Sequence, residues 1–338
     1  MPDQGATVIV QVDNVKRLTK GQVTEVIELS MRATQADGVA PLSEQALLAV
    51  RDGATSAATD SHFLTYAGTR LAGYAHLDHG VAGQPGTAEL VVDPSYRRDG
   101  VGTALIRALD NAALKDTALK DPQTPRGETL RVWSHGDLDG ARALAQRDGN
   151  SIVRELWQMR RSLRPDAPAL PGISLPQGFR TRHFVVGQDE EAWLRVNSRA
   201  FADHPEQGRM TRHDLDQRIA QEWFDAKGLL LIEDTRGRLP VLAASHWTKV
   251  VPAEGQEIHP ALPVGEVYVV GVDPAYQGLG LGRAVTVLGL AHLRARGLAE
   301  AMLYVDADNR AAVATYSRLD FARRAVDIMY LRTVHTAV

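Results

Sequence analysis

The 338-residue sequence contains no cysteine, which excludes disulfide bonds, thiolate nucleophiles and cysteine-ligated zinc. It also has no run of lysine or arginine, and its net charge of -3 argues against nucleic acid or a membrane surface as a partner. No apolar stretch reaches the length that a membrane helix needs. The N-terminus has an early acid and no basic lead into an apolar core, so we expect no secretory signal and a cytoplasmic protein.

The remaining composition, 44% apolar and 23% charged residues, is typical of a globular protein with room for two domains. The stretch from Arg161 to Arg180 holds four of the sixteen prolines and shows little amphipathic period. Such a stretch favours an extended linker. We therefore predict an N-terminal domain over 1–163, a linker over 164–177 and a C-terminal domain over 178–338.

The two halves repeat the same order of elements. Each reads as helices, a hairpin, a strand that runs through a glycine turn into a helix, and then strand, helix and closing strand. In the shared strand, Val92 matches Val272. Strands that alternate with helices predict an α/β (α+β) fold with partly parallel sheets, and the long period indicates duplication of a whole domain.

The repeated turn fits the pattern [Arg/Gln]-x-x-Gly-x-Gly, at residues 97–102 and again at 277–282. Glycines here allow a sharp turn and leave backbone N–H groups exposed at the start of a helix. Together with the helix dipole, these groups favour a phosphate or pyrophosphate. Neither the P-loop pattern nor a complete G-x-G-x-x-G is present. The two copies thus favour an anion site of another kind over a turn shaped only by packing.

This strand, "VDP" and turn resemble the acetyl-CoA signature of the GNAT acyltransferase superfamily. Together with "HPEQG", "WFD", "HWTKV" and "DNRAAVATYSRLDF", they resemble the mycothiol synthase family of tandem GNAT enzymes. The resemblance implies two fused GNAT domains, each a mixed, partly parallel twisted sheet flanked by helices. It also implies transfer of acetyl from acetyl-CoA to the cysteinyl amine of cysteinyl-glucosaminyl-inositol. We expect a monomer that needs no metal.

The chemistry requires a base for the amine and an acid for the departing thiolate. Glu266 begins an otherwise apolar strand, where a half-buried carboxylate and a solvated one are equally plausible from the residues alone. Tyr316 lies on a later helix, where a tyrosine is more often a core residue. The resemblance assigns the base to Glu266 and the acid to Tyr316. The family usually has glycine before the phenylalanine that follows, and here Asp320 is expected to take that positive-φ position.

The resemblance also implies the binding residues. In the second half, the acetyl-CoA contacts would be Val270, Gly271, Val272, Gln277, Gly278, Leu279, Gly280, Leu281, Gly282, Arg283, Asn309, Arg310, Ala311, Ala312, Val313 and Ala314. In the first half they would be Leu90, Val91, Val92, Arg98, Asp99, Gly100, Val101, Gly102 and Thr103. The acceptor contacts would be Glu44, Glu206, Lys249, Glu266 and Tyr304.

The first half lacks the catalytic pair. Gly86 stands in sequence register with Glu266, Glu89 lies three positions on and is expected on the other sheet face, and the corresponding helix has no tyrosine. We predict a non-catalytic copy that binds acetyl-CoA or supports the second half. His76 and His79 have metal-like spacing but no evident third ligand, so a solvated pair is favoured.

Two alternatives stay open at this point. One is a tandem GNAT enzyme that acetylates another small amine, such as an aminoglycoside. The other is a non-catalytic acetyl-CoA sensor, against which the Glu266 and Tyr316 pair argues.

Overall fold

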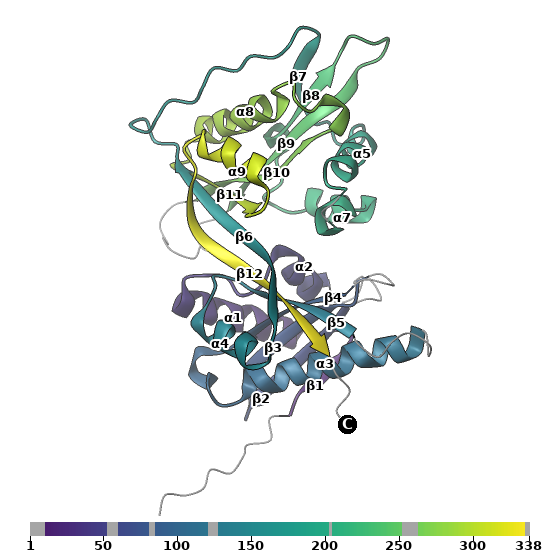
Figure 1. Ribbon diagram of the computed structural model, residues 1–338, viewed down its shortest axis with the longest axis vertical. Helices are drawn as coiled ribbons and strands as arrows, with labels where there is room; N and C mark the ends of the chain where they lie inside the picture. The colour runs from purple at the N-terminus through teal and green to yellow at the C-terminus, as the bar shows by residue number, and fades with distance from the viewer. Residues whose placement is uncertain are drawn as a thin grey trace, which may run out of the picture. The chain divides into compact units, whose positions relative to one another are not determined.

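The structure is a computed structural model that describes residues 11–52, 60–80, 85–120, 128–202, 205–251 and 263–334. Its internal contacts divide the chain into two units (Figure 1). The first unit comprises Met1–Leu156 and Ala325–Val338, and the second unit comprises Trp157–Arg324. Each unit therefore contains a short segment from the other half of the sequence.

The elements follow the predicted order in both halves, except that a short strand that was not predicted, β1 or β7, precedes the helices. The first half contains β1 (Asp13–Val15), α1 (Lys20–Asp37), α2 (Glu44–Asp52), β2 (Asp60–Ala67), β3 (Arg70–Asp78), β4 (Gly86–Val92), α3 (Val101–Lys120), β5 (Glu128–Ser134), α4 (Asp139–Arg147) and β6 (Ser151–Ser162). The second half contains β7 (Phe179–His183), α5 (Glu190–Ala200), α6 (Pro205–Gly208), α7 (Arg212–Ile219), β8 (Leu229–Asp234), β9 (Val241–Val251), β10 (Val264–Val272), α8 (Leu281–Ala295), β11 (Glu300–Asp306), α9 (Arg310–Ser317) and β12 (Ala322–Val334).

The first unit has the strand order β1-β2-β3-β4-β5-β12. Neighbouring strands are antiparallel except β4 and β5, which are parallel. The helix α3 packs Leu105 and Leu109 on one face of the sheet, and α1 packs Val26 and Leu29 on the other. Figure 1 shows the helices on both sides of the strands. The predicted mixed sheet flanked by helices is confirmed.

The second unit repeats this plan with the order β6-β11-β10-β9-β8-β7, in which β10 and β11 form the parallel pair. The helix α8 covers one face through residues such as Leu290 and Leu293, which pack with Leu303 of β11. On the other face, α5 places Trp193 against Trp247 of β9. Both units thus bury an apolar layer on each side of the sheet. Each of β4 and β10 occupies the same place in the strand order of its own unit.

The contacts divide the chain at different points from the predicted boundaries. The strand β6 begins in the first unit and ends in the second, and β12 does the reverse. The proline-rich stretch 164–177 is part of the second unit. Within it, the Pro168 carbonyl accepts a hydrogen bond from Arg161 at 3.1 Å, and Leu170 and Leu175 pack against the core. Its prolines therefore mark an extended segment that binds along one unit.

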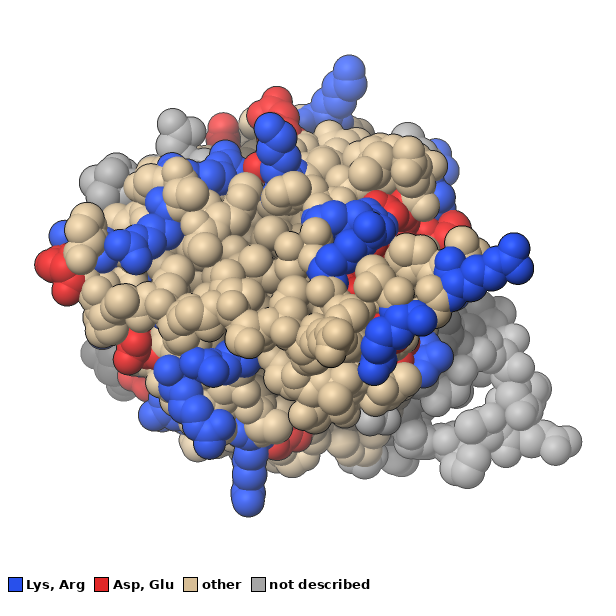
Figure 2. Space-filling model, turned by 90° about the horizontal axis from the view of Figure 1, so that it is seen from above, with Lys and Arg blue, Asp and Glu red and all other residues tan. Residues whose placement is uncertain are grey.

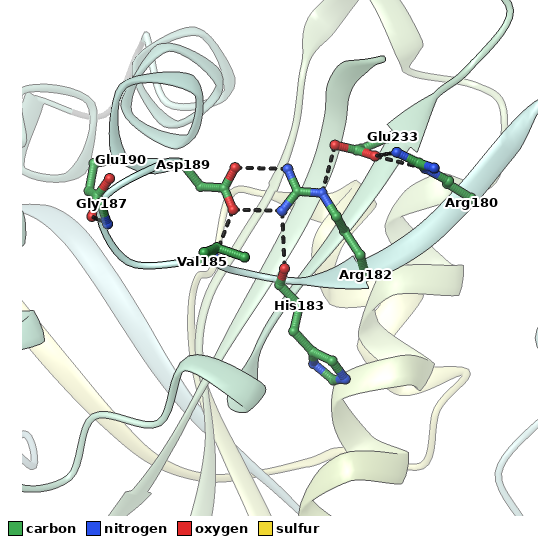
Figure 3. Close-up of polar contacts among 8 residues, drawn as sticks. All are labelled: Arg180, Arg182, His183, Val185, Gly187, Asp189, Glu190 and Glu233. Carbon is green, nitrogen blue, oxygen red and sulfur yellow. Dashed lines mark hydrogen bonds and ion pairs between the residues drawn. The ribbon is translucent and has the colours of Figure 1, made fainter. Parts of the chain in front are cut away.

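An ion-pair cluster joins the edge strand β7 to the start of α5 (Figure 3). Arg182 donates two hydrogen bonds to Asp189, at 2.6 and 2.8 Å, and a third to Glu233 at 2.7 Å. Burial alone would raise the pKa of Asp189, but the bonds from Arg182 and the Val185 amide lower it. Because such bidentate pairs are geometrically specific, the cluster fixes where α5 begins.

Charged side chains are interspersed on the face seen in Figure 2, and uncharged residues cover its centre. Lysine and arginine lie there in separate groups, several beside acidic neighbours. This face therefore shows no continuous basic patch. Within the described ranges, no helix has the length and apolar character to span a membrane.

Candidate active site

The strands β10 and β11 run side by side only at their beginnings. Their parallel ladder joins Gly265 to Ala301, Glu266 to Met302 and Val267 to Leu303, and in the described chain it ends there. On its other edge, β10 stays paired with β9 as far as Val272. In the described chain, the edge of β10 from Tyr268 to Val272 is therefore not paired with β11. A backbone edge of this kind pairs with an extended ligand as an added strand would.

A β-bulge lies at the point where the ladder ends. Val267 is opposite Thr248 and Val269 is opposite Trp247, so Tyr268 is an extra residue in β10. Bulges bend a strand and increase its twist, which accounts for the parting of β10 from β11. The bulge was not predicted, since one inserted residue leaves no mark in an apolar strand.

Glu266 lies just before the bulge and is buried, with 9% of its surface exposed. Lys249 is directly opposite it on β9, so the two side chains share a sheet face. Tyr304 lies two residues beyond Met302, the β11 partner of Glu266, and alternation places it on the same face. Its hydroxyl accepts a hydrogen bond from Gln158 at 3.0 Å. Three of the predicted acceptor residues are thus grouped on one face of β9, β10 and β11.

Tyr316 lies on α9 and packs against the core on the opposite face, with its ring centroid 5.8 Å from that of Phe321. Burial raises the pKa of Tyr316 to about 12. The helix ends in a left-handed cap at Asp320, whose φ is 61°, and the Phe321 amide bonds back to the Tyr316 carbonyl. Asp320 therefore takes the expected positive-φ position. Glu266 and Tyr316 therefore lie on different faces of the sheet.

The predicted anion turn follows β10. Gly278 and Gly280 both have positive φ, of 79° and 77°, and Gly280 caps α8 without any side-chain bond. The first amides of α8, at Leu281 to Arg283, therefore point out of a helix N-terminus. Asn309 caps the start of α9, and its side chain accepts the Ala312 amide at 3.1 Å. The predicted cofactor residues thus lie on the β10 edge, the turn and two helix starts.

The first unit builds the same turn. Arg98 and Gly100 have φ of 73° and 85°, at the positions of Gly278 and Gly280. In both units the aspartate of "VDP" accepts the amide two residues on, at 3.0 Å from Asp93 to Ser95 in the first unit and 2.9 Å in the second. The turn therefore has the same backbone in both copies, with the amides of Val101 to Thr103 at the start of α3.

The strand before this turn differs between the units. The pairing of β3 with β4 is regular from Thr87 to Val92, and the parallel ladder with β5 continues to Glu89 and Trp133. Because β4 has no bulge, the ladder position of Glu266 is taken by Thr87 rather than by Gly86. Glu89 then lies on the same face as that position. The prediction that it faces the other way was wrong for this reason.

Glu89 is held in a buried cluster of the first unit. It accepts hydrogen bonds from the Ser43 amide and hydroxyl, both at 2.6 Å, and pairs with His135 at 3.4 Å. The other nitrogen of His135 lies 3.2 Å from Asp327. Burial alone would lower the pKa of His135, but Asp327 and Glu89 raise it to about 10. Burial alone would raise the pKa of Glu89, but His135 and Ser43 lower it.

The other predicted residues are placed as follows. Glu44 begins α2 and is half-buried, whereas the side chain of Glu206, in α6, lies outside the described residues. His76 is buried and bonds to Asp60 at 2.9 Å, so the expectation that it is solvated was wrong, and His79 bonds to Ser61 at 2.8 Å. In the part of the chain that the structure describes, no three potential metal ligands are grouped to hold an ion.

Family models match each half of the chain. The model of the acetyltransferase (GNAT) family matches residues 196–321, and that of the acetyltransferase (GNAT) domain matches residues 59–135. Among solved structures, a GCN5-related N-acetyltransferase from Sphaerobacter thermophilus has a TM-score of 0.68, 21% identity and 97% coverage of both chains. A tandem GNAT protein from the clavulanic acid biosynthesis pathway also has a TM-score of 0.68, at 16% identity, covering 97% of this chain and 100% of its own. The tandem GNAT fold is confirmed.

Two curated relatives match almost the whole chain, and both are named mycothiol acetyltransferase. The protein of Thermomonospora curvata is 51% identical over 93% of this chain and 94% of its own length. That of Kytococcus sedentarius is 48% identical over 93% of this chain and 95% of its own length. At this identity over nearly the full length, the chain belongs to the mycothiol acetyltransferase family of tandem GNAT enzymes.

Proposed function

We propose that this acetyltransferase moves acetyl from acetyl-CoA to the cysteinyl amine of cysteinyl-glucosaminyl-inositol, the step that yields mycothiol. The relatives' names support the product class. The structural observation that carries the proposal is the buried Glu266, opposite Lys249 and at the end of the ladder between β10 and β11. This places a carboxylate and an ammonium beside a backbone edge suited to an extended thioester arm.

In this proposal, the edge from Val270 to Val272 pairs with the pantetheine arm of acetyl-CoA. The turn from Gln277 to Arg283 receives the pyrophosphate, since its positive-φ glycines leave the first amides of α8 exposed. The start of α9, from Asn309 to Ala314, lines the other side. Binding therefore needs backbone groups more than particular side chains.

The reaction forms a C–N bond between the amine and the thioester carbonyl and breaks the C–S bond. An α-amino group has a pKa of roughly 7.7–8.0, so Glu266 suffices as the acceptor of its proton. The thiolate that leaves needs a proton, and Tyr316 supplies it. Because burial raises the pKa of Tyr316 to about 12, the phenol stays protonated at neutral pH until that step.

The polar acceptor groups fit the residues that surround Glu266. Lys249 and Tyr304 offer an ammonium and a phenol on the same sheet face, and such groups bind the hydroxyls of a sugar and an inositol. Glu206 and Glu44 are proposed as further acceptor contacts because of the family resemblance. In the first unit, the turn after β4 is proposed to bind acetyl-CoA without turnover.

The proposal is tested by mass spectrometry of the protein incubated with acetyl-CoA and a panel of amines that includes cysteinyl-glucosaminyl-inositol. Selective acetylation of the cysteinyl amine is expected. Acetylation of another amine alone would keep the enzyme class and discard this acceptor. Binding of acetyl-CoA with no product from any amine would support the sensor alternative.

A further inference from the structure

Lys249 lies against two aromatic rings to which the sequence had assigned no role. Its ammonium nitrogen is 4.6 Å from the ring centroid of Trp223 and 5.0 Å from that of Tyr268. The two rings are in contact with each other, with centroids 5.2 Å apart at an angle of 65°. Both distances are within the range in which a ring face attracts a cation. We call Trp223 and Tyr268 the aromatic platform.

A buried tryptophan packs against both rings of the platform. The ring of Trp247, which is fully buried, lies 5.7 Å from Trp223 and 5.3 Å from Tyr268, in edge or tilted contact. Trp247 is held in turn by Trp193 at 5.4 Å. These contacts leave the platform little freedom to move, since packed rings of this size are costly to displace.

The β10 bulge and a hydrogen bond also hold Tyr268 in place. Tyr268 is the extra residue of the β10 bulge, and its hydroxyl accepts a hydrogen bond from Arg218 of α7 at 2.9 Å. Arg218 is itself buried, with 9% of its surface exposed, and donates to the Asp214 carbonyl at 3.0 Å. The bulge therefore does more than part β10 from β11. It brings a ring to the face that Lys249 and Glu266 share.

A lysine side chain has a flexible four-carbon stem, and an unsupported ammonium samples many positions. Here two rings restrict the ammonium of Lys249, whose position on β9 is directly opposite Glu266. We propose that Trp223 and Tyr268 are positioning residues, which hold the Lys249 ammonium in the orientation that receives the polar groups of the acceptor. They then set acceptor affinity through Lys249 rather than by chemistry of their own.

This inference rests on the proposed role of Lys249 in acceptor binding. The first unit supplies a contrast within the same chain. There the residue opposite Thr87, the counterpart of Glu266, is Asp78. The first unit therefore has an acidic residue where the second unit has Lys249.

The experiment compares Trp223→Leu with Trp223→Phe, which keeps a smaller ring face. Trp223→Leu is expected to raise the acceptor KM about tenfold, with kcat and the acetyl-CoA KM changed less than threefold. Trp223→Phe is expected to recover most of this loss. Tyr268→Phe, which keeps the ring and removes the hydroxyl that accepts from Arg218, is expected to raise the acceptor KM about two- to threefold.

A double-mutant cycle separates positioning from a general structural effect. In a Lys249→Met background, Trp223→Leu is expected to raise the acceptor KM less than twofold further, although its effect on the melting temperature persists. An undiminished effect in that background would overturn the inference, because Trp223 would then act without Lys249.

The remaining outcomes distinguish this inference from the proposed function. If wild-type protein acetylates the cysteinyl amine but Lys249→Met leaves the acceptor KM unchanged, the platform inference fails and the enzymatic assignment stands. If Lys249→Met raises the acceptor KM and Trp223→Leu does not, only the positioning role is overturned. If wild-type protein acetylates a different amine, the proposed acceptor fails, and the cycle is run with that amine.

Discussion

The two units share a turn but not a strand. After β4 and after β10 the backbone makes the same left-handed turn into a helix, with matched positive φ at Arg98 and Gly278. Just before the turn, β10 bulges at Tyr268 and parts from β11, whereas β4 stays in register with β5 for one more pair. The duplicated chain has therefore kept the geometry of the turn and changed the register of the strand that leads into it.

The acidic side chains on β4 and β10 also differ between the two units. The second unit presents Glu266 across from Lys249 at the end of its short ladder. In the first unit, the acid on that face, Glu89, is bound by Ser43 and His135. A carboxylate already paired to a buried imidazolium is a poor proton acceptor. A duplicated domain can thus retain the backbone of this turn while the acid on the adjoining strand becomes part of a buried cluster.

The largest effect on activity is expected from replacing the acidic residue of the second unit, Glu266. Glu266→Gln removes the proposed base and is expected to lower kcat about 10²- to 10⁴-fold. The matched change in the first unit, Glu89→Gln, is expected to leave kcat within about twofold below its melting temperature. Steady-state assays with the cysteinyl acceptor measure both. If Glu89→Gln lost as much activity as Glu266→Gln, the roles given to the two units would be wrong.

The next effect concerns stability and its dependence on pH. Replacing His135 with Leu leaves the Glu89 and Asp327 carboxylates without their shared partner, and a loss of about 3 to 5 kcal/mol in unfolding free energy is expected. Because the folded pKa of His135 is raised to about 10, its contribution is complete below the unfolded value of 6.5 and is lost as pH rises toward 10. The lowered pKa of Glu89 gives a contribution that is present above 4.5 and lost in acid.

Urea unfolding at pH 6 and pH 9.5 measures this dependence. Wild-type protein is expected to lose stability between the two values, and His135→Leu is expected to lose markedly less. Arg142→Leu is a suitable control, since its pair with Asp137 is on the surface of the same unit. An equal pH dependence in His135→Leu would show that the imidazole does not carry it.

A smaller effect on activity is expected from replacing Tyr316, the proposed acid that protonates the leaving thiolate. Tyr316→Phe keeps the ring that contacts Phe321 and removes only the hydroxyl, so a fall in kcat of about 10²-fold is expected with an unchanged acetyl-CoA KM.

In the first unit, Ala145 of α4 is the residue equivalent to Tyr316. The Asn150 amide bonds to the Ala145 carbonyl as the Phe321 amide bonds to the Tyr316 carbonyl. Ala145→Tyr is expected to confer no activity on a Glu266→Gln protein. A rescue there would mean that the first unit needs only an acid to act.

The sequence predicted those features that short patterns determine. The glycine turn and the order of strands and helices follow from residue spacing, and the structure confirms both. The bulge at Tyr268 could not be predicted in this way. It depends on the register with β9 and on Arg218, which is distant in the sequence. Missing that one residue made Gly86 rather than Thr87 the counterpart of Glu266 and turned Glu89 to the wrong face.

The contacts of the proline-rich segment and the aromatic platform could not be predicted, for a similar reason. Prolines 165 to 176 indicate extended chain but not what that chain contacts, and the contacts keep it on the second unit. Trp223 and Tyr268 are distant in sequence and each resembles an ordinary core aromatic. Only the tertiary packing brings both onto Lys249. The catalytic and binding roles themselves stay predictions, since they depend on ligands rather than on the fold.

The helix caps offer the finest test of how far the units have diverged. The caps of α4 and α9 have the same left-handed geometry, with Gly149 at φ 69° and Asp320 at 61°. Aspartate tolerates this conformation better than most residues but less well than glycine. Asp320→Gly is therefore expected to stabilise the protein by about 0.5 to 1 kcal/mol, and Gly149→Asp to destabilise it by a similar amount, as measured by thermal unfolding. Because the same cap orients Tyr316, kcat of Asp320→Gly is the sharper readout. An unchanged kcat would mean that aspartate already holds the helix end as glycine does, whereas a change in either direction would mean that the cap residue tunes the position of the acid.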